Sequence, residues 1–69
     1  MERMKLKLFR IERKLTQAQM ASKIGYNRCH YALIENGSRE YSLRFLNAFA
    51  EAFALPVPEA IEILKQETE

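Results

Sequence analysis

Residues 27–30 place side chains that can bind a base, a phosphate or a metal ion next to one another: Asn27, Arg28, Cys29 and His30. The planar guanidinium of Arg28 can donate two hydrogen bonds to guanine O6 and N7, and it can equally contact a phosphate or remain in water. A zinc site needs three or four ligands, and the chain has no other Cys or His, so we expect no metal here. This run of residues therefore favours hydrogen bonding over metal chemistry.

The residue types that most catalytic sites need are missing. The chain contains no Asp, so a Ser, His and Asp trio cannot form, and acyl transfer and most acid–base catalysis are excluded. A chain of 69 residues also leaves little room for an active-site cleft. We therefore expect a protein that is not an enzyme and that has no cofactor and no evident small-molecule ligand.

The cysteine content and the lack of a long apolar run indicate the compartment. One Cys cannot close an intramolecular disulfide, and Met1 leads into a charged stretch without a signal peptide or a membrane span. We expect a cytoplasmic protein with no membrane partner. Cys29 is then either a small contact residue or a thiol that senses oxidation.

Charge is distributed unevenly along the chain. Residues 1–39 contain nine Lys or Arg against three Glu, a net charge of +6, whereas residues 40–69 contain two against six, a net charge of −4. A molecule polarised in this way is suited to a polyanion on one side and to water or a protein partner on the other. An ordinary solvated surface is the alternative interpretation of the same charges.

Helices are the elements that must position these residues. The apolar residues recur at helical spacing, and no segment alternates apolar and polar residues for long enough to form a strand. The composition, 48% hydrophobic and 29% charged, is that of a globular domain. We expect one all-α domain of five short helices over residues 1–69, the first at about 4–13 with Leu6 and Phe9 on one face.

A helix at about 17–24 has clear start and stop residues. Thr16 is a suitable N-cap, and Gln19, three residues later, completes a capping-box pattern. Gly25 ends the helix because it can adopt a positive φ.

A third helix is predicted to follow after a short turn. Asn27 is its N-cap, and it runs over about 28–36 until Gly37 closes it. Two helices joined by a three-residue turn that contains Gly have the spacing of a helix-turn-helix.

Two further helices are expected to complete the core. Ser42 caps the fourth, and the fifth begins after Pro56, with Pro58 tolerated near its start because the missing N–H would be unpaired there. The residues expected to face the core are Phe45 or Leu46, Phe49 and Phe53 on the fourth helix and Val57, Ala60, Ile61 and Leu64 on the fifth.

The helix at about 28–36 can be divided into faces at about 100° per residue. Tyr31 and Ile34 share the face that should point to the core. The opposite face carries Cys29, Ala32, Leu33 and Asn36. Only thymine presents a methyl group in the major groove, so Ala32 or Leu33 against that methyl is a hypothesis for the apolar surface.

Residues 15–55, LTQAQMASKIGYNRCHYALIENGSREYSLRFLNAFAEAFAL, resemble the Xre family of phage-repressor and Cro-like helix-turn-helix domains. In that family a Leu-Thr-Gln opens the second helix, a Gly lies in the turn, an Ile-Glu-Asn-Gly ends the third helix and a Ser-Leu opens the fourth. The matching residues are Leu15, Thr16 and Gln17, then Gly25, then Ile34, Glu35, Asn36 and Gly37, then Ser42 and Leu43. The combination at correct spacing is more specific than any single piece.

The resemblance implies a compact five-helix, lambda-repressor-like domain that binds double-stranded DNA as a homodimer on a pseudo-palindromic operator, with the helix at about 28–36 in the major groove. It also implies a transcriptional regulator, a repressor of phage, plasmid or mobile-element type, in the bacterial cytoplasm. The base-reading candidates are Arg28, Cys29, Ala32 and Leu33. The phosphate-binding candidates are Gln17, Asn27, His30, Asn36, Ser38, Arg39 and Arg44. Arg10 and Glu35 are implied to form a structural pair.

Four positions depart from the pattern of the family. Lys14 and Ala54 stand where Gly is common, and Tyr41 stands where Pro is common. Pro56 replaces the usual polar cap of the fifth helix. We expect these differences to affect the turns and the start of the last helix, but not the fold.

Some apolar residues lie off the predicted core faces. Met4, Leu8 and Ile11 form a second stripe on the first helix, and Ile63 lies off the core face of the fifth. In one interpretation these residues form a dimer or partner surface. In the other, the stripe on the first helix packs under the fifth helix.

A second class of function is an antitoxin- or adaptor-like module that reuses this fold to bind a protein. The apolar face of the third helix, which could dock in a hydrophobic groove, and the acidic second half of the chain favour it. The basic first half, Gln17, Arg28 and Arg39 favour DNA instead.

Overall fold

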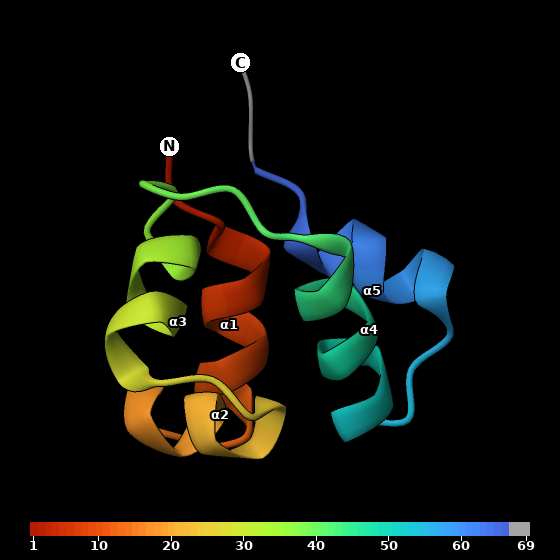
Figure 1. The fold of residues 1–69 in the computed structure, drawn as a ribbon, viewed down its shortest axis with the longest axis horizontal. Helices are drawn as coiled ribbons and strands as arrows, with labels where there is room; N and C mark the ends of the chain where they lie inside the picture. Colours follow the sequence, from red (N-terminus) through yellow and green to blue (C-terminus); the bar gives the residue numbers. More distant parts are fainter. Residues whose placement is uncertain (67–69) are drawn as a thin grey trace.

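Residues 1–66, the part of the chain that the computed structural model describes, contain five helices. They are α1 (Met4–Glu12), α2 (Gln17–Ile24), α3 (Arg28–Glu35), α4 (Leu43–Ala52) and α5 (Val57–Leu64), and no strand occurs among the described residues (Figure 1). The predicted all-α fold is confirmed, and α1 and α3 each end one residue before the predicted end. Residues 67–69 of the predicted domain lie outside the described residues.

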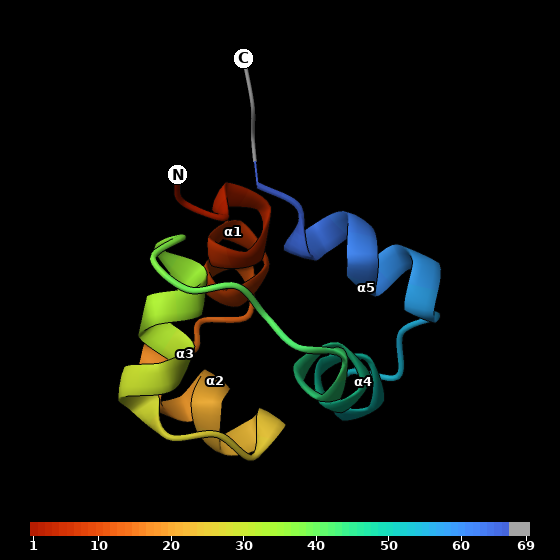
Figure 2. The ribbon, with the colours of Figure 1, turned by 45° about the horizontal axis from the view of Figure 1, so that its top comes forward.

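Helix α1 joins two pairs of helices. α2 packs against α3, α4 packs against α5, and α1 contacts both α3 and α5. Figure 1 shows α1 beside α3, with α2 across their lower ends and with α4 and α5 on the other side of the molecule. Because α2 also contacts α4, the helices enclose a common core (Figure 2).

The core is built from apolar side chains of all five helices, and its fully buried members include Leu6, Met20, Tyr31, Ile34, Phe45, Phe49, Ala60 and Leu64. The predicted inward faces of α1 and α3 are confirmed. That of α4 is confirmed at Phe45, Leu46 and Phe49, whereas Phe53 follows the end of α4 and is half-buried. Helices of 8 to 10 residues are marginal on their own. Burying one large apolar side chain contributes about 1.5 to 3 kcal/mol, so packing rather than helix propensity holds these short helices.

The predicted core face of α5 is partly wrong. Ala60 and Leu64 are buried as expected, but Val57 and Ile61 are 42% and 37% exposed. Ile63, which the sequence pattern places off this face, packs against the core instead. The inward stripe consists of Ala60, Ile63 and Leu64, an i, i+3, i+4 set, and its flank at Ile61 is left to solvent.

The capping residues act as the sequence predicts. Thr16 Oγ1 accepts a hydrogen bond from the N–H of Gln19 at 3.1 Å, and Gln19 Oε1 accepts one from the N–H of Thr16 at 2.9 Å. Ser42 Oγ accepts from the N–H of Phe45 at 3.1 Å. α5 begins directly after Pro56 without a side-chain cap. The capping box of α2 is thus confirmed.

Phe45 joins the aromatic side chains around α3. Its ring centroid lies 5.1 Å from that of Tyr26, 6.4 Å from that of Tyr31 and 6.5 Å from that of Tyr41. Tyr26 precedes α3, and Tyr41 comes after the loop that follows α3. One side chain of α4 therefore packs against aromatic rings before, within and after α3.

Lys14 and Ala54 adopt the left-handed conformation that favours glycine, with φ of 57° and 53°. The turns therefore keep a geometry suited to Gly although Gly is absent. We expect Lys14→Gly and Ala54→Gly each to raise the free energy of unfolding by up to about 1 kcal/mol. An L side chain costs about 1 to 2 kcal/mol in this conformation, whereas Gly loses about 0.5 to 1 kcal/mol more in backbone entropy.

Urea denaturation of the two single variants measures this change. The control is Ala18→Gly, an exposed position within α2, which should lower the free energy of unfolding by about 0.5 to 1 kcal/mol. A similar loss at all three positions would show that the left-handed conformations carry no strain.

Candidate nucleic-acid interface

The turn between α2 and α3 fixes the direction in which α3 leaves α2. α2 ends at Gly25, whose φ is 89° and whose N–H donates to the carbonyl of Ala21 at 2.9 Å. α3 begins after Asn27, whose Oδ1 accepts from the N–H of His30 at 2.7 Å. Both predicted signals are confirmed, and they produce two helices joined by a three-residue turn.

Helix α3 has one face in the core and another at the surface. Tyr31 and Ile34 are fully buried, as predicted. The base-reading candidates lie on the outer side: Arg28 and Cys29 are exposed, Leu33 is 37% exposed and Ala32 is half-buried. Because the core does not need the exposed side chains, the outer side of α3 is available to a partner. Its role in reading bases stays a prediction.

His30 is held at the start of α3 by an aromatic contact. Its ring lies edge-on to that of Tyr26, with the centroids 5.0 Å apart, and Tyr26 in turn packs against Phe45. His30 is therefore half-buried and tied to the turn before α3. Asn27 is exposed but uses its side-chain oxygen as a cap, which leaves its amide group for a phosphate.

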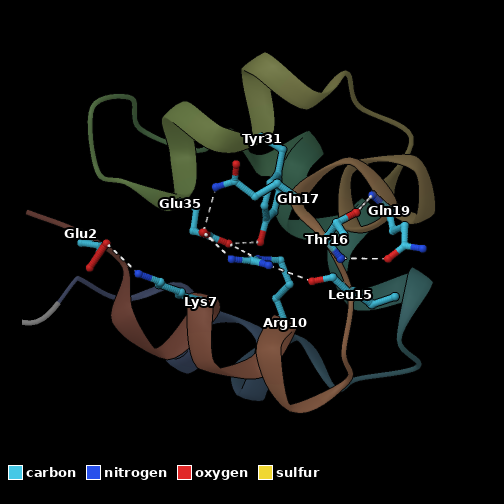
Figure 3. A network of polar contacts seen from close by, with 9 residues as sticks. All are labelled: Glu2, Lys7, Arg10, Leu15, Thr16, Gln17, Gln19, Tyr31 and Glu35. Carbon is cyan, nitrogen blue, oxygen red and sulfur yellow. Dashed lines mark hydrogen bonds and ion pairs between the residues drawn. The ribbon is translucent and has the colours of Figure 1, made fainter.

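A buried carboxylate connects α1, α2 and α3 (Figure 3). Arg10 Nε donates to Glu35 Oε2 at 2.8 Å, and Arg10 Nη2 donates to Glu35 Oε1 at 3.3 Å. The hydroxyl of Tyr31 donates to Oε2 at 2.6 Å, and Gln17 Nε2 donates to Oε1 at 3.1 Å. Arg10 also donates to the carbonyl of Leu15 at 2.7 Å. The implied pair of Arg10 and Glu35 is present, and two further donors complete it.

Gln17 has a partner that the sequence pattern did not reveal. Its amide nitrogen donates to Glu35, so the half-buried side chain is fixed at the first residue of α2. One N–H of that amide remains beyond the hydrogen bond to Glu35, so a phosphate contact by Gln17 stays a prediction. The bond means that Glu35 orients Gln17 as well as Arg10.

The environment of Glu35 shifts the pKa values of three groups. Burial raises the pKa of the Glu35 carboxyl, but the hydrogen bonds from Arg10, Tyr31 and Gln17 outweigh burial and leave this pKa below its usual value of 4.5. The hydrogen bond to Glu35 raises the pKa of the Arg10 guanidinium. Burial, together with the hydrogen bond to Glu35, raises the pKa of the Tyr31 hydroxyl. At neutral pH the site therefore holds an ionised carboxylate, a guanidinium and a neutral phenol.

The lowered pKa of Glu35 predicts acid sensitivity. The unfolded chain takes up a proton at this carboxyl at a higher pH than the folded chain does, so the stability from ionised Glu35 is complete above about pH 4.5 and is lost as the pH falls through the folded-state pKa. Urea denaturation should show that wild type has a higher free energy of unfolding than Glu35→Gln at neutral pH. This difference should become smaller below about pH 4.5. A gap that does not depend on pH would mean that the charge of Glu35 contributes nothing.

The loop after α3 is closed by backbone and side-chain bonds. The N–H groups of Ser38 and Arg39 both donate to the carbonyl of Leu33, at 3.0 and 3.1 Å, and Asn36 Oδ1 accepts from the N–H of Ser38 at 2.9 Å. Gly37 has a φ of 86°, and a Cβ there would overlap backbone atoms of residue 1. The loop is therefore compact and its end close to the start of the chain.

The phosphate-binding candidates of this region lie at the surface. Asn36, Ser38 and Arg39 are exposed in the loop, and Arg44 is exposed in the first turn of α4. They follow the outer side of α3 in sequence and flank its last turn. Exposed basic and polar groups next to such a helix can contact phosphates, and these four roles stay predictions.

Arg3 is a functional candidate that the sequence analysis missed. It is 1% exposed, and its guanidinium donates to backbone carbonyls of α3, of the loop after α3 and of α5. In the sequence, Arg3 is one more basic residue of the charged N-terminal stretch. No periodicity marks it, because it precedes α1, and its partners are 31 to 61 residues away in sequence.

The predicted partner surface is only partly exposed. Met4, Leu8 and Ile11 are 40%, 50% and 48% exposed, so the alternative in which they pack under α5 is wrong. Ile63 packs against the core and does not belong to this surface. The remaining stripe lies on the side of α1 opposite Leu6 and Phe9, and a role in dimerisation stays a prediction.

The described residues were also searched for pockets, metal-binding groups and membrane-spanning helices. Within residues 1–66 no pocket and no group of three residues able to hold a metal ion occur. Cys29 is exposed and has no second thiol nearby in the sequence. No helix in this part of the chain has the length and apolar character to cross a membrane.

Comparison with known proteins agrees with this geometry. A family model described as a helix-turn-helix domain matches residues 4–68, which is nearly the whole chain. No curated protein matches the chain. The matched segment includes all five helices, and thus the network around Glu35 and the outer side of α3.

Proposed function

Because the chain belongs to the helix-turn-helix domain family, we propose that it is a sequence-specific DNA-binding regulator of transcription that places α3 in the major groove. The observation that carries this proposal is the outer side of α3. Its side chains are not used by the core, while the opposite side is locked by Tyr31, Ile34 and the Glu35 network. A helix held rigidly on one side and free on the other suits recognition of a groove.

The candidate side chains divide into two roles. Arg28, in the first turn of α3, reads guanine through its planar fork, and Ala32 and Leu33 contact thymine methyl groups. The backbone-binding groups flank them: Gln17, Asn27 and His30 before or at the start of α3, and Asn36, Ser38, Arg39 and Arg44 after it. The net charge of +6 in residues 1–39 favours binding to DNA, which is a polyanion.

The finer form of the proposal is a repressor of the Xre type. It acts as a homodimer on a pseudo-palindromic operator, is encoded by a phage, plasmid or other mobile element, works in the bacterial cytoplasm and has no enzymatic activity. The exposed stripe of Met4, Leu8 and Ile11 supports the dimer, because apolar side chains on one helix face tend to meet a partner.

One observation favours a protein partner instead of DNA. Leu33 is exposed beside Cys29, so the outer side of α3 is more apolar than a typical DNA-reading surface. An antitoxin- or adaptor-like module could dock this side in a hydrophobic groove of another protein. A variant of Arg28 can distinguish the two functions, because its guanidinium would bind DNA but would not contribute to binding in a hydrophobic groove.

Replacing Arg28 by alanine should remove sequence preference. The variant loses the bidentate bond to guanine, so discrimination at that base should fall by about 1 to 3 kcal/mol, while binding to unrelated duplexes changes little. Selection of sites from random duplex DNA with wild type and Arg28→Ala measures the preference, and enriched half-sites about one helical turn apart would support the dimer. Lys65→Ala is the control, because this exposed cation follows α5.

Salt dependence tests the same proposal independently. If a dimer contacts about six phosphates, the logarithm of the binding constant should fall with the logarithm of salt concentration with a slope of about −5. Mobility shifts over a salt series give this slope. A binding constant that does not change with salt concentration would favour the adaptor. The adaptor would also be favoured if no DNA site is enriched and Arg28→Ala still binds a protein partner.

A further inference from the structure

Arg3 is a fully buried cation outside the Glu35 network. Its side chain is 2% exposed, and burying a charge is costly unless hydrogen bonds satisfy its donors. Nε donates to the carbonyl of Leu64 at 2.9 Å, and Nη1 donates to the carbonyls of Ile34 at 2.6 Å and Arg39 at 3.1 Å. Nη2 contacts Glu40 Oε1 at 3.3 Å. Three of the four partners belong to α3 or to the segment directly after it.

The two carbonyls on Nη1 lie at opposite ends of one loop. Ile34 is in the last turn of α3, and Arg39 lies in the segment between α3 and α4. A single nitrogen that bonds both carbonyls bridges residues 35–38, which are the last residue of α3 and the first three residues after it. The N–H of Arg3 also donates to the carbonyl of Glu35 at 2.8 Å, so the backbone and the side chain of Arg3 hold the same loop.

An arginine is needed for this arrangement because of its shape. The planar guanidinium offers donors in several fixed directions, whereas the ammonium of lysine is a compact group that cannot reach the carbonyls of Leu64 and Ile34 and the Glu40 carboxylate with the same geometry. The guanidinium also lies over the ring of Tyr41, 5.3 Å from the centroid, which supports its plane. Lysine at this position would keep the charge and lose the fork.

We propose that Arg3 is a positioning residue for DNA binding, which fixes the loop after α3 so that Arg39 meets the DNA backbone at a set distance from α3. This role rests on the proposed function of the chain. Arg3 itself does not touch DNA, because it is buried. It acts through the exposed Arg39, whose carbonyl it holds. The outer side of α3 and the loop are thereby presented to DNA as one surface.

A double-mutant cycle with Arg3→Lys and Arg39→Ala tests the proposal. Both variants are made in a Lys14→Gly, Ala54→Gly background, which we expect to add stability away from the loop. Their affinity for a mixed-sequence duplex is measured by mobility shift. Each single variant should bind roughly five- to tenfold more weakly, and the double variant no more weakly than Arg39→Ala alone, because groups that act as one unit are not additive.

Amide hydrogen exchange gives a readout that does not depend on DNA. The N–H groups of Ser38 and Arg39 should exchange faster in Arg3→Lys, while amides in α2 keep their wild-type rates. Arg13→Lys is the matched control. Arg13 also donates to a backbone carbonyl, that of Phe9 at 3.1 Å, and it lies over the aromatic rings of Phe9 and Phe53 rather than beside the loop after α3. It should change neither loop exchange nor DNA affinity.

The outcomes separate the two proposals. Losses that add in the double variant, or loop amides that keep their wild-type rates, would overturn the role of Arg3 while leaving DNA binding intact. An Arg3→Lys chain that unfolds even in the stabilised background would assign Arg3 to global stability and also overturn that role. A wild-type chain that binds no duplex would contradict the proposed function, and the role of Arg3 would fall with it.

Discussion

Glu35→Ala is expected to lower the free energy of unfolding by about 3 to 5 kcal/mol, because removing one partner of a buried ion pair leaves the other charge uncompensated. The Glu35 side chain is 4% exposed and that of Arg10 is 13% exposed, so water cannot replace the lost bonds fully. Tyr31 loses the acceptor of its hydroxyl, and Gln17 loses the acceptor of its amide. For a domain of this size the loss is a large part of the total stability. Urea denaturation at neutral pH measures it.

The control for this prediction is another glutamate with two cationic neighbours. Glu62 contacts Lys5 at 3.0 Å and Lys65 at 3.2 Å, and these contacts hold the pKa of its carboxyl below the usual value, but its side chain is 55% exposed. Glu62→Ala should therefore leave the urea transition close to that of wild type, because exposed pairs are screened by water. Equal losses at Glu35 and Glu62 would mean that burial of the carboxylate is unimportant.

Phe45→Ala is expected to cost about 3 to 5 kcal/mol, which is the usual cost of truncating a buried Phe. The ring is fully buried and contacts Tyr26, Tyr31 and Tyr41, so its removal leaves a cavity beside α3. We also expect weaker sequence preference under conditions in which the variant is still folded, because Tyr26 and Tyr31 lose the ring that packs against them. Denaturation and site selection, measured on the same variant, test the two effects separately.

Leu43→Ala is the matched control on the same helix. Leu43 is 71% exposed at the first residue of α4, so its truncation should change the free energy of unfolding by no more than about 0.5 kcal/mol. If Leu43→Ala is as damaging as Phe45→Ala, then Leu43 is covered in solution, for example by a second copy of the chain. A mild effect of Phe45→Ala would show that the rings around it repack.

The helices could be predicted from the sequence because local signals mark their ends. The capping hydrogen bonds join residues that are close in sequence, namely those of Thr16 with Gln19, of Asn27 with His30 and of Ser42 with Phe45. Such local contacts can be recognised from residue types at a fixed spacing. The faces of α3 follow from helical periodicity in the same way. These signals placed α3 and its outer side, whereas the phosphate-binding candidates on either side of it were implied by the family resemblance, and their roles stay predictions.

The parts that could not be predicted depend on contacts between distant segments. Ile63 and Ile61 are chemically alike and only two residues apart, and α1 and α4, which pack against α5, decide which of them is buried. Gln17 can bind a phosphate or a carboxylate equally well, and only the fold brings Glu35 beside it. In the sequence, Arg3 is a basic residue like Lys5 and Lys7 nearby, and nothing there distinguishes the one that is buried. A single sequence contains no record of such pairings.

Arg3 also determines which parts of the chain can unfold separately. The ends of small domains commonly fray, because few contacts hold them. In this chain the carbonyl of Leu64 accepts from the same guanidinium that bonds α3, so detaching α5 would leave part of a buried cation without its acceptors. The first and last helical segments therefore belong to the same cooperative unit as α3. A short terminal helix that would otherwise melt first is linked to the melting of the whole domain.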